Sequence, residues 1–485
     1  MWHVNLCVLA LVVVSFTHWV YRWSNPKCSG KLPPGSMGWP LLGETLQFFA
    51  TNRTWDTSPF IKERLKRYGS VFRTSFVGLR VIVSADLDLN NMVFQQEGQL
   101  FKSWYPESTR SLYGDQNVST LHGDAHKHFK NMVLSLLGHT SLRNMLSEIQ
   151  SVSTRTIQTW EVQESVEIKA AIEDMVFGLS AKKLISYDQE NSPANLRENF
   201  DDFLDGLLSI PLAIPGTTFY KCLQGRKRVM AMLKNMLEKR RKTPNKVNTD
   251  YFDYVLEELK KNNTFTEAIA LDMMFVLLFV SFETTSLALL VAIKLLTDNP
   301  RALKELTEEH ENILKGRENK DADLTWEEYK SMTFTFQVIN ESVRMANVVP
   351  AIFRKAIKDI KFKEYTIPAD WVVMVSPAAV HLDPDNYKDP LNFNPWRWEG
   401  MDYKGASKTF MAFGGGQRFC VGADFSRMQL AVFLHCLVTK YQWKPIKGGE
   451  PIRAPGLQFP GGFHVQFTSK ATHNKDTKDK SPKQK

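Results

Sequence analysis

The sequence contains few cysteines. Only five of its 485 residues are cysteine, and no two of them form a Cys-x-x-Cys pair. A small, odd and scattered set argues against both a disulfide framework and a zinc finger. Four of the thiols are expected to be reduced and mostly buried, whereas the fifth has unusual neighbours that need a separate explanation. The four are Cys7, Cys28, Cys222 and Cys436, and the fifth is Cys420.

Several sequence signatures are also absent. The chain has no Gly-x-Gly-x-x-Gly fingerprint of a dinucleotide-binding domain and no internal repeat. It also lacks the aromatic-interleaved basic motifs of the common nucleic-acid modules, so nucleic acid is not expected as a partner. Its content of 43% hydrophobic and 23% charged residues is that of a globular protein and not of a mainly disordered one.

Positive charge is concentrated at the end of the chain. The net charge is +9, and residues 470–485 hold six lysines against two aspartates. Such a segment is predicted to be a basic disordered tail. An anionic membrane surface is its expected neighbour, because juxtamembrane lysines are attracted to acidic lipids.

The first apolar run has no lysine or arginine in front of it. It extends from Trp2 to Tyr21, about the length that crosses a bilayer, and Arg22, Lys27 and Lys31 follow it. A cleaved signal peptide, the alternative, would have positive charge before the run. Because positive flanks stay in the cytosol, residues 1–22 are expected to be a retained single-pass anchor. The four sequons should then be unglycosylated: Asn52, Asn117, Asn262 and Asn340.

The remaining chain divides into a hinge and one body. Prolines and glycines in Lys31–Gly43 predict a stiff, proline-rich hinge over residues 23–45. From residue 46 to 469 helical periodicity dominates, with shorter strand-like stretches and a hairpin turn at Gly78. The apolar segment Ser209–Tyr220 precedes a basic amphipathic helix, which fits either an ordinary surface helix or membrane contact.

One short segment is very unlike the rest. Phe413–Gly422 reads FGGGQRFCVG, and its three consecutive glycines indicate a sharp turn or a close approach of the backbone to another group. The pattern Phe-x-x-Gly-x-Arg-x-Cys-x-Gly arises by chance in only about 10⁻⁴ of chains of this length. It resembles the haem-thiolate signature of the cytochrome P450 family, and the resemblance extends over essentially the whole chain. It implies the P450 fold, mainly α with minor β, preceded by a single N-terminal transmembrane helix.

The resemblance assigns this segment to a haem b group. It implies that Cys420 is the axial thiolate ligand of the iron, whose electron donation favours O–O cleavage. The helix predicted after the cysteine would favour the thiolate through its N-terminal partial charge. Arg418 would pair with a propionate, and Phe413 would cover the sulfur. The glycines expected close to the macrocycle are Gly414, Gly415, Gly416 and Gly422.

Two elements upstream of the cysteine also match the family. Glu341-Ser-Val-Arg344 matches its Glu-x-x-Arg element, and Pro395-Trp-Arg397 matches its Pro-x-Arg element. The resemblance implies a buried network of Glu341, Arg344 and Arg397 in which bidentate pairing holds the structure together. Glu-x-x-Arg alone is more often a surface pair, so the implied network depends on the position of the motif in the chain.

Three further residues are implied to meet the haem propionates. Arg354 matches a second propionate ligand of the family. His126-x-x-x-Lys130 falls where many members have Trp-x-x-x-Arg. Histidine and lysine can still meet a propionate, but lysine lacks the bidentate fork of arginine.

The oxygen side is implied to come from Glu283-Thr284, inside a long apolar helix. Thr284 would hydrogen-bond the bound dioxygen and help to deliver protons, and Glu283 would supply the relay. The alternative is that Thr284 simply bonds back to Val280 in a buried helix. The usual small residue and glycine before the acid are Val280-Ser281 here, which predicts an oxygen groove that is tighter or differently shaped.

The reaction implied by the resemblance is monooxygenation with O₂. Without a dinucleotide fold, the chain would receive electrons from NADPH through a separate membrane-bound cytochrome P450 reductase, at the endoplasmic reticulum membrane with the catalytic domain in the cytosol. Two alternatives remain: a haem-thiolate isomerase or dehydratase that needs no reductase, and a non-catalytic sensor or carrier. Thr284 disfavours both.

The expected substrate is a sterol or triterpenoid. The segments around the cysteine, Glu341 and Pro395 look like those of the plant clan that oxidises sterols, triterpenoids and brassinosteroids. Side-chain hydroxylation, with successive oxidations and carbon–carbon cleavage as an extension, is the leading hypothesis, and ring hydroxylation of a pentacyclic triterpene is the second. The apolar residues expected to line the substrate pocket are Trp104, Phe279, Val349, Ile352 and Phe459.

Overall fold

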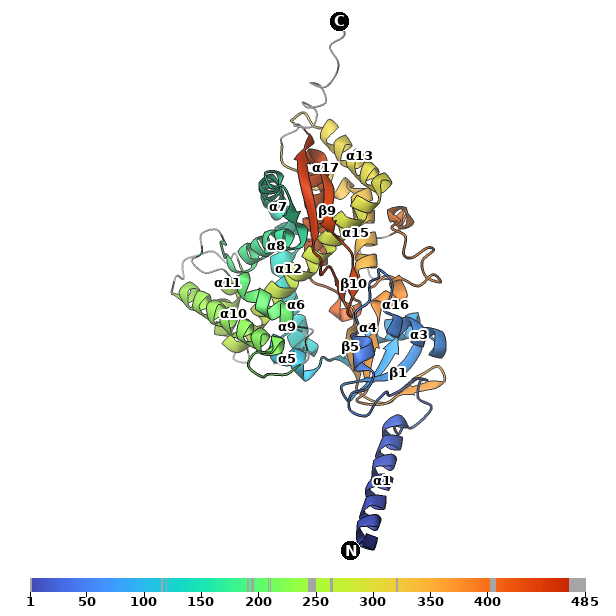
Figure 1. Ribbon diagram of the computed structural model, residues 1–485. Helices are drawn as coiled ribbons and strands as arrows, with labels where there is room; N and C mark the ends of the chain where they lie inside the picture. Colours follow the sequence, from blue (N-terminus) through green and yellow to red (C-terminus); the bar gives the residue numbers. More distant parts are fainter. Residues whose placement is uncertain are drawn as a thin grey trace.

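The long helix α12 (Glu267–Asp298) passes through the middle of the molecule (Figure 1). Apolar side chains occupy all of its faces, so it is buried among other helices. The Thr266 hydroxyl caps its start by accepting from the Ile269 N–H, and Pro300 follows its end. The computed structural model describes residues 2–114, 117–118, 120–189, 192, 196–207, 209, 211–242, 250–261, 265–319, 322–401 and 407–470.

Helices make up most of the described chain, which confirms the expectation of a mainly helical fold. Several of them pack against α12, and α17 also packs against α7. The other helices are α1 (Trp2–Ser24), α2 (Thr45–Phe48), α3 (Pro59–Tyr68), α4 (Leu87–Gln95), α5 (Glu107–Tyr113), α6 (Gly123–Leu137), α7 (His139–Glu161), α8 (Ile168–Ile185), α9 (Glu198–Gly206), α10 (Thr218–Arg241), α11 (Tyr251–Lys261), α13 (Pro300–Lys315), α14 (Trp326–Ser331), α15 (Thr333–Ala346), α16 (Pro377–His381), α17 (Ala423–Lys440), and the short 3₁₀ helices η1 (Pro395–Trp398) and η2 (Gly416–Arg418). Those against α12 include α8, α10, α15 and α17.

The sheets are small and lie at the edge of the helical body. Five strands pair in the order β1 (Val71–Phe76), β2 (Leu79–Ser84), β8 (Val372–Val375), β5 (Ile352–Ala356) and β3 (Phe101–Ser103). The hairpin predicted at Gly78 joins β1 to β2, with positive φ at Val77 and Gly78, as a tight hairpin turn requires. The remaining strands are β4 (Val166–Glu167), β6 (Ile360–Phe362), β7 (Tyr365–Ile367), β9 (Tyr441–Gly448), β10 (Ile452–Arg453), β11 (Leu457–Gln458) and β12 (Phe463–Ser469).

Helix α1 projects away from the body, next to the end of the molecule that holds β1 (Figure 1). Two described helices are long and apolar enough to cross a membrane, α1 over Val4–Ser24 and α12. The window of α12 is 78% buried and that of α1 is 0% buried, so α12 is a core helix. The expected tail after Lys470 and the sequon at Asn262 lie outside the described residues.

The cysteines differ from the expectation in one case. Cys222 and Cys436 are buried and Cys28 is half-buried, whereas Cys7 is exposed because it lies on α1, where no other element packs against it. All five thiols are free. Cys420 is also exposed, and the space that exposes it is the cavity described next.

Candidate active site

A cavity of about 330 Å³ lies between α12, α15 and the loop that precedes α17. The side chain of Cys420 is exposed into it, and α12 contributes Thr284, Thr285 and Ala288. Many residues predicted from the sequence line this one space. They are Cys420, Arg418, Phe413, Gly414, Gly415, His126, Lys130, Arg354, Thr284, Val349 and Ile352.

The loop before α17 folds back on itself around the cysteine. The Cys420 N–H donates to the Phe413 carbonyl at 3.0 Å, and the Phe419 N–H donates to the Gly416 carbonyl at 3.1 Å. Gly414 has a φ of 74°, a left-handed conformation that suits glycine. This fold presents the sulfur at the cavity wall, one turn before the first residue of α17.

The glycines of this loop were predicted to lie close to a haem, but two of them make a close approach to another part of the protein. A Cβ on Gly415 would lie 2.8 Å from the ring of Phe94, and one on Gly416 would lie 2.0 Å from the Phe94 carbonyl oxygen. Gly416 also has a φ of 61°. At Gly422 a Cβ would make only an ordinary 3.9 Å contact with the sulfur of Cys420. The close approach at residues 415 and 416 is therefore to helix α4.

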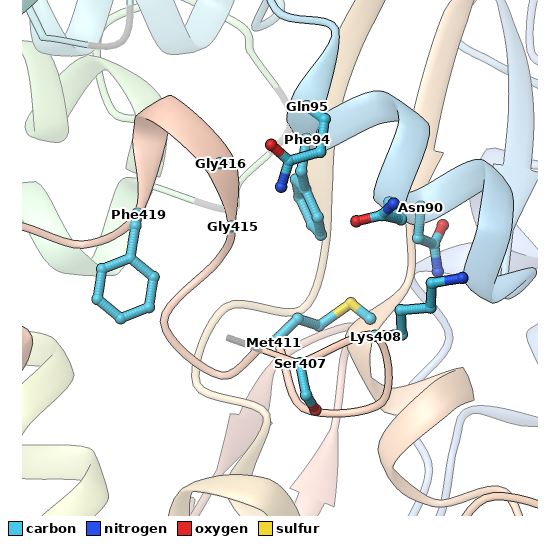
Figure 2. A pocket seen from close by; sticks show the side chains of 10 residues that line it. Asn90, Phe94, Gln95, Ser407, Lys408, Met411, Gly415, Gly416 and Phe419 are labelled. Carbon is cyan, nitrogen blue, oxygen red and sulfur yellow. The ribbon is translucent and has the colours of Figure 1, made fainter. Parts of the chain in front are cut away.

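Figure 2 shows a second hollow, of about 480 Å³, against which the same loop packs. Residues Phe94, Met411, Gly415 and Phe419 line both spaces. Asn90 of α4, which is buried, lines the second hollow. The cysteine loop is therefore a thin wall between two cavities, and this wall requires small residues at its points of contact with α4.

The environment of the Cys420 thiol contains opposing influences. Burial raises the pKa of the thiol, whereas the Gly422 N–H and the charges of Arg427 and Lys130 lower it, and burial prevails. The backbone N–H at the start of α17 thus favours the thiolate, in the direction expected of a helix N-terminus. Arg427 also lies over the ring of Phe413, 4.5 Å from its centroid, so this ring is held in place beside the loop.

Cationic side chains gather on one part of the cavity wall. Burial and the neighbouring Arg418 lower the pKa of His126 to about 4, so its ring is neutral at neutral pH. The Lys130 ammonium donates to the Gln417 carbonyl at 2.9 Å. Arg418 donates from Nε to Glu97 at 2.8 Å and from its Nη atoms to the Val118 and Leu121 carbonyls. The predicted propionate side therefore forms one cluster.

The predicted network of Glu341, Arg344 and Arg397 is assembled. Glu341 and Arg344 are 0% exposed, and two Arg344 nitrogens donate to the two Glu341 oxygens at 2.8 and 2.9 Å. The Nε atom of Arg397 donates to Glu341 Oε1 at 3.0 Å, and the indole N–H of Trp398 donates to Oε2 at 2.9 Å. Every oxygen of this carboxylate thus has charged or polar partners, which ties α15 to η1.

Thr284 and Glu283 point to different surroundings. Thr284 lines the cavity. Its hydroxyl donates to the Val280 carbonyl at 2.7 Å, which is the hydrogen bond expected if Thr284 has only a structural role in the helix. Glu283 does not line the cavity. It lies near Lys169 of α8, with Glu173 and Arg197 behind, and its buried Oε2 has no hydrogen-bond partner among the described residues. Burial raises the pKa of Glu283, against the charge of Lys169.

The expected substrate-pocket residues divide into two groups. Val349 and Ile352 line the cavity. The other three lie elsewhere because each packs into a neighbouring cluster. Phe279 packs against Tyr113 and Phe203, with ring centroids 5.7 and 5.2 Å away. The ring centroids of Phe459 and Trp55 are 6.0 Å apart. Trp104 packs against the apolar cluster that includes side chains of β1 and β2.

Several residues at the site were not predicted. Glu97 contacts two arginines of the cavity wall, Arg354 and Arg418. Lys169, Glu173 and Arg197 surround Glu283. Arg197 and Lys169 both pair with Glu173, at 2.7 and 2.5 Å. Lys169 and Glu173 form an i,i+4 pair on α8, but the contacts of these residues with Glu283 and Arg197, and those of Glu97 with its arginines, join distant parts of the sequence. Only the unbalanced charge of a lone half-buried acid such as Glu283 could have suggested that cations lie nearby.

The residues present fit a haem. A haem needs a soft axial ligand, an apolar envelope and cations for its two propionates. The cavity supplies a cysteine sulfur, apolar side chains such as Val343, Val348 and Leu430, and the cluster of Arg354, Arg418 and Lys130. A helical fold with a thiol exposed into such a cavity defines a haem-thiolate protein.

Comparisons with known proteins place the chain in one family. Residues 33–465 match the family described as Cytochrome P450. The chain is 53% identical to Cytochrome P450 87A3 of Oryza sativa subsp. japonica (96% of this chain, 91% of that protein) and 40% identical to the β-amyrin 16α-hydroxylase CYP87D16 of Maesa lanceolata (97% and 100%). The structure of retinoic acid-bound cyanobacterial CYP120A1 is similar with a TM-score of 0.81 and 26% identity, covering 91% of this chain and 100% of that one.

The chain therefore belongs to the cytochrome P450 family, and it is a monooxygenase of the kind that carries a thiolate-ligated haem. It is related to plant P450s that oxidise sterols and triterpenoids, since other homologues are named for cucurbitadienol and cholesterol hydroxylation. The exposed apolar helix α1 is consistent with membrane anchoring of a plant P450.

Proposed function

We propose that this monooxygenase oxidises a sterol or triterpenoid, with Cys420 as the axial ligand of its haem. One observation carries the proposal: the Cys420 thiol, the Thr284 hydroxyl and apolar side chains including Val349 and Ile352 line one cavity. A fused-ring lipid needs such an apolar wall. Bound haem supplies the redox chemistry that inserts one atom of dioxygen into a C–H bond.

The cationic cluster orients the haem in this proposal. Arg354, Arg418 and Lys130 bind the propionates by charge, and His126 binds as a neutral hydrogen-bonding ring. A guanidinium has five N–H donors. Arg418 donates to Glu97, Val118 and Leu121 and has His122 Nδ1 3.2 Å from Nη2, so at least one donor remains for a propionate. Phe413 limits water near the sulfur, and Gly414 and Gly422 leave room at the loop. The buried Glu341 network keeps this side rigid.

Protons reach the cavity along α12 in this proposal. The Thr284 Oγ1 atom holds a proton at the cavity wall, and Glu283 is its next neighbour in sequence. Lys169, Glu173 and Arg197 connect Glu283 to Asp174, which is exposed at the surface. The raised pKa of Glu283 keeps it able to accept and release a proton nearer to neutral pH, as a general acid–base group requires.

Two positions of oxidation are supported by different relatives. Side-chain oxidation, with possible successive steps, is our leading proposal, and a homologue at 34% identity is named as a cholesterol 22-monohydroxylase. Ring hydroxylation of a pentacyclic triterpene is the second candidate, and it is favoured by the name of the 40% identical β-amyrin 16α-hydroxylase. Both reactions need the same apolar cavity and the same oxygen chemistry.

The proposed setting is the endoplasmic reticulum membrane, with the body in the cytosol and a separate NADPH–cytochrome P450 reductase as the electron donor. Helix α1 and exposed apolar side chains near it, such as Trp39 and Leu41, provide the contact with lipid. Anchoring both proteins in one membrane raises their effective concentration.

The decisive experiment is expression of the chain with a plant reductase in sterol-producing yeast that also makes β-amyrin. Product profiles with the reductase, without it and with Cys420→Ser should show oxidised sterols or triterpenoids only in the first case. Side-chain and ring products separate the two candidates. Products formed equally without reductase would instead indicate an isomerase or dehydratase, and fatty-acid or phenolic products alone would contradict the substrate class.

A further inference from the structure

Glu97 lies between two arginines of the cavity wall, Arg354 and Arg418. Its Oε1 atom is 2.8 Å from Arg418 Nε, and its Oε2 atom is 2.8 Å from Arg354 Nε. The Glu97 side chain is 8% exposed, and the two arginine side chains are 11% and 5% exposed. Glu97 does not line the cavity, whereas both arginines do. The carboxylate therefore contacts the guanidiniums away from the cavity surface.

The backbone fixes this carboxylate firmly. Glu97 lies in the tight turn between α4 and β3, where Gly98 has a φ of 84°. The Ser103 N–H of β3 donates to Glu97 Oε1 at 3.1 Å, and Ser103 is the strand partner of Arg354 on β5. The acid is thus bound by β3, the strand that pairs with the one carrying Arg354, and the second arginine comes from the cysteine loop. This one residue links the sheet to the loop that carries the sulfur.

The charges of the cluster balance only when Glu97 is counted. Arg354, Arg418 and Lys130 contribute three positive charges, His126 is neutral, and the two propionates of a haem contribute two negative charges. Arg427, another cation of the cavity wall, has Asp424 3.7 Å away. Burial would raise the pKa of Glu97, but His122 and the charges of Arg354 and Arg418 lower it to about 2. Glu97 is therefore ionised at any pH of physiological interest.

We propose that Glu97 is a positioning residue for the haem: it holds Arg354 and Arg418 at the distance that the propionates require and adds the negative charge that neutralises the cluster. This inference rests on the proposed haem site at Cys420. Two separable effects follow from it. The geometry of the two contacts governs how firmly haem is held. The charge opposes one-electron reduction of the haem, because reduction adds a negative charge nearby.

Two substitutions separate these effects. Glu97→Asp keeps the charge but is one methylene too short to reach both guanidiniums. Glu97→Gln keeps the length but loses the charge. Glu44→Gln is the matched control, because Glu44 is also 8% exposed and pairs with an arginine, Arg64, but lies outside the cavity. The readouts, on full-length purified holoproteins, are the rate of haem transfer to apomyoglobin, the reduction midpoint by spectroelectrochemistry, and thermal stability.

Glu97→Asp should speed haem transfer by about tenfold and leave the reduction equilibrium within about twofold of the wild type. Glu97→Gln should shift that equilibrium toward the reduced form by about tenfold, which is about 59 mV for a one-electron couple. Glu44→Gln should change only thermal stability. A Glu97→Gln protein that matches the wild type in haem transfer and reduction midpoint would overturn the inference.

The failure of this inference differs from the failure of the proposed function. If wild-type protein lacks the carbon monoxide difference band of a haem-thiolate, or if Cys420→Ser retains it, the assignment of the haem ligand is wrong whatever Glu97 does. If the band depends on Cys420 but both Glu97 variants behave like Glu44→Gln, the ligand stands and Glu97 is only a structural ion pair.

Discussion

Glu341 is a buried glutamate and Glu283 a half-buried one, and the two carboxylates have opposite surroundings. The carboxylate of Glu341 accepts from Arg344, Arg397 and Trp398, so both of its oxygens are paired. The Oε2 atom of Glu283 is buried and has no hydrogen-bond partner among the described residues. Glu341 lies away from the cavity, whereas Glu283 directly precedes Thr284 at its wall.

This difference separates a structural acid from one suited to proton transfer. A buried carboxylate whose every oxygen is paired joins the elements that carry its partners, and its loss leaves a buried cation without a counter-ion. Burial raises the pKa of Glu283, whose Oε2 atom has no hydrogen-bond partner among the described residues, and a raised pKa suits a carboxylate that exchanges protons. Substitution of each glutamate by its neutral isostere should therefore have opposite effects on stability.

The largest effect is expected for Glu341→Gln. Loss of the charge leaves Arg344, which is 0% exposed, without its counter-ion, and the free energy of unfolding should fall by about 3–5 kcal/mol. Chemical denaturation of the holoprotein measures this change. The exposed Glu399, just after η1, supplies the control Glu399→Gln, which should stay within about 0.5 kcal/mol of the wild type. An equal loss of stability in Glu341→Gln and Glu399→Gln would contradict the structural role of the Glu341 network.

Glu283→Gln should leave the fold intact but slow the reaction. An amide cannot accept and release a proton, so product formation should fall by about 100-fold, the usual size of a general acid–base contribution. Turnover and the fraction of reduced oxygen lost as peroxide are the measurements. Asp298→Asn, at the far end of the same helix, should change neither. Full activity of Glu283→Gln would show that protons reach Thr284 by another path.

The pH dependence of the free energy of unfolding should reveal the raised pKa of Glu283. The pKa of Glu283 in the folded protein is raised above its usual 4.5, so folded protein retains a proton that the unfolded chain has lost. Its contribution to stability is therefore present below about pH 4.5 and is lost as the pH rises through the raised pKa. Glu283→Gln should match the wild type in acid and exceed it at neutral pH, by about 1 kcal/mol. A lower stability at neutral pH would contradict the assigned direction.

The smallest effect is expected on the cationic side, for Lys130→Arg. The substitution keeps the charge and adds a bidentate fork where lysine offers a point charge. Transfer of haem to apomyoglobin should slow by about twofold to threefold, while the reduction midpoint stays unchanged. Lys127→Arg, three residues earlier on α6, is the control because it does not line the cavity. Faster haem loss would mean that Lys130 acts through its bond to the Gln417 carbonyl instead.

The sequence predicted those features that depend on short, continuous patterns. The helical body, the hairpin at Gly78 and the clustering of His126, Lys130, Arg354 and Arg418 could be read from local periodicity or from a family motif. The network of Glu341 also belongs here, because two of its members share one helical turn. Each of these features is determined by residues close together in the chain or by a motif of fixed spacing.

Features that depend on tertiary contacts were missed or misread. Glu97 meets Arg354 and Arg418 across more than 250 residues, and no local pattern marks that contact. Phe279 is apolar, as a pocket residue should be, but Tyr113 and Phe203 occupy its face. The need for Gly416 arises from the Phe94 carbonyl of another helix. Apolar side chains look alike in a sequence, and only packing decides which of them face a cavity.

One measurement tests the central claim directly: the carbon monoxide difference spectrum and turnover of Cys420→Ser beside the wild type. The substitution replaces the sulfur with a hydroxyl at the cavity wall and leaves the Glu341 network untouched. We expect a folded protein that has lost both the thiolate band and all product formation. A variant that keeps the band and the activity would show that the iron is bound elsewhere, which contradicts the assignment of the site.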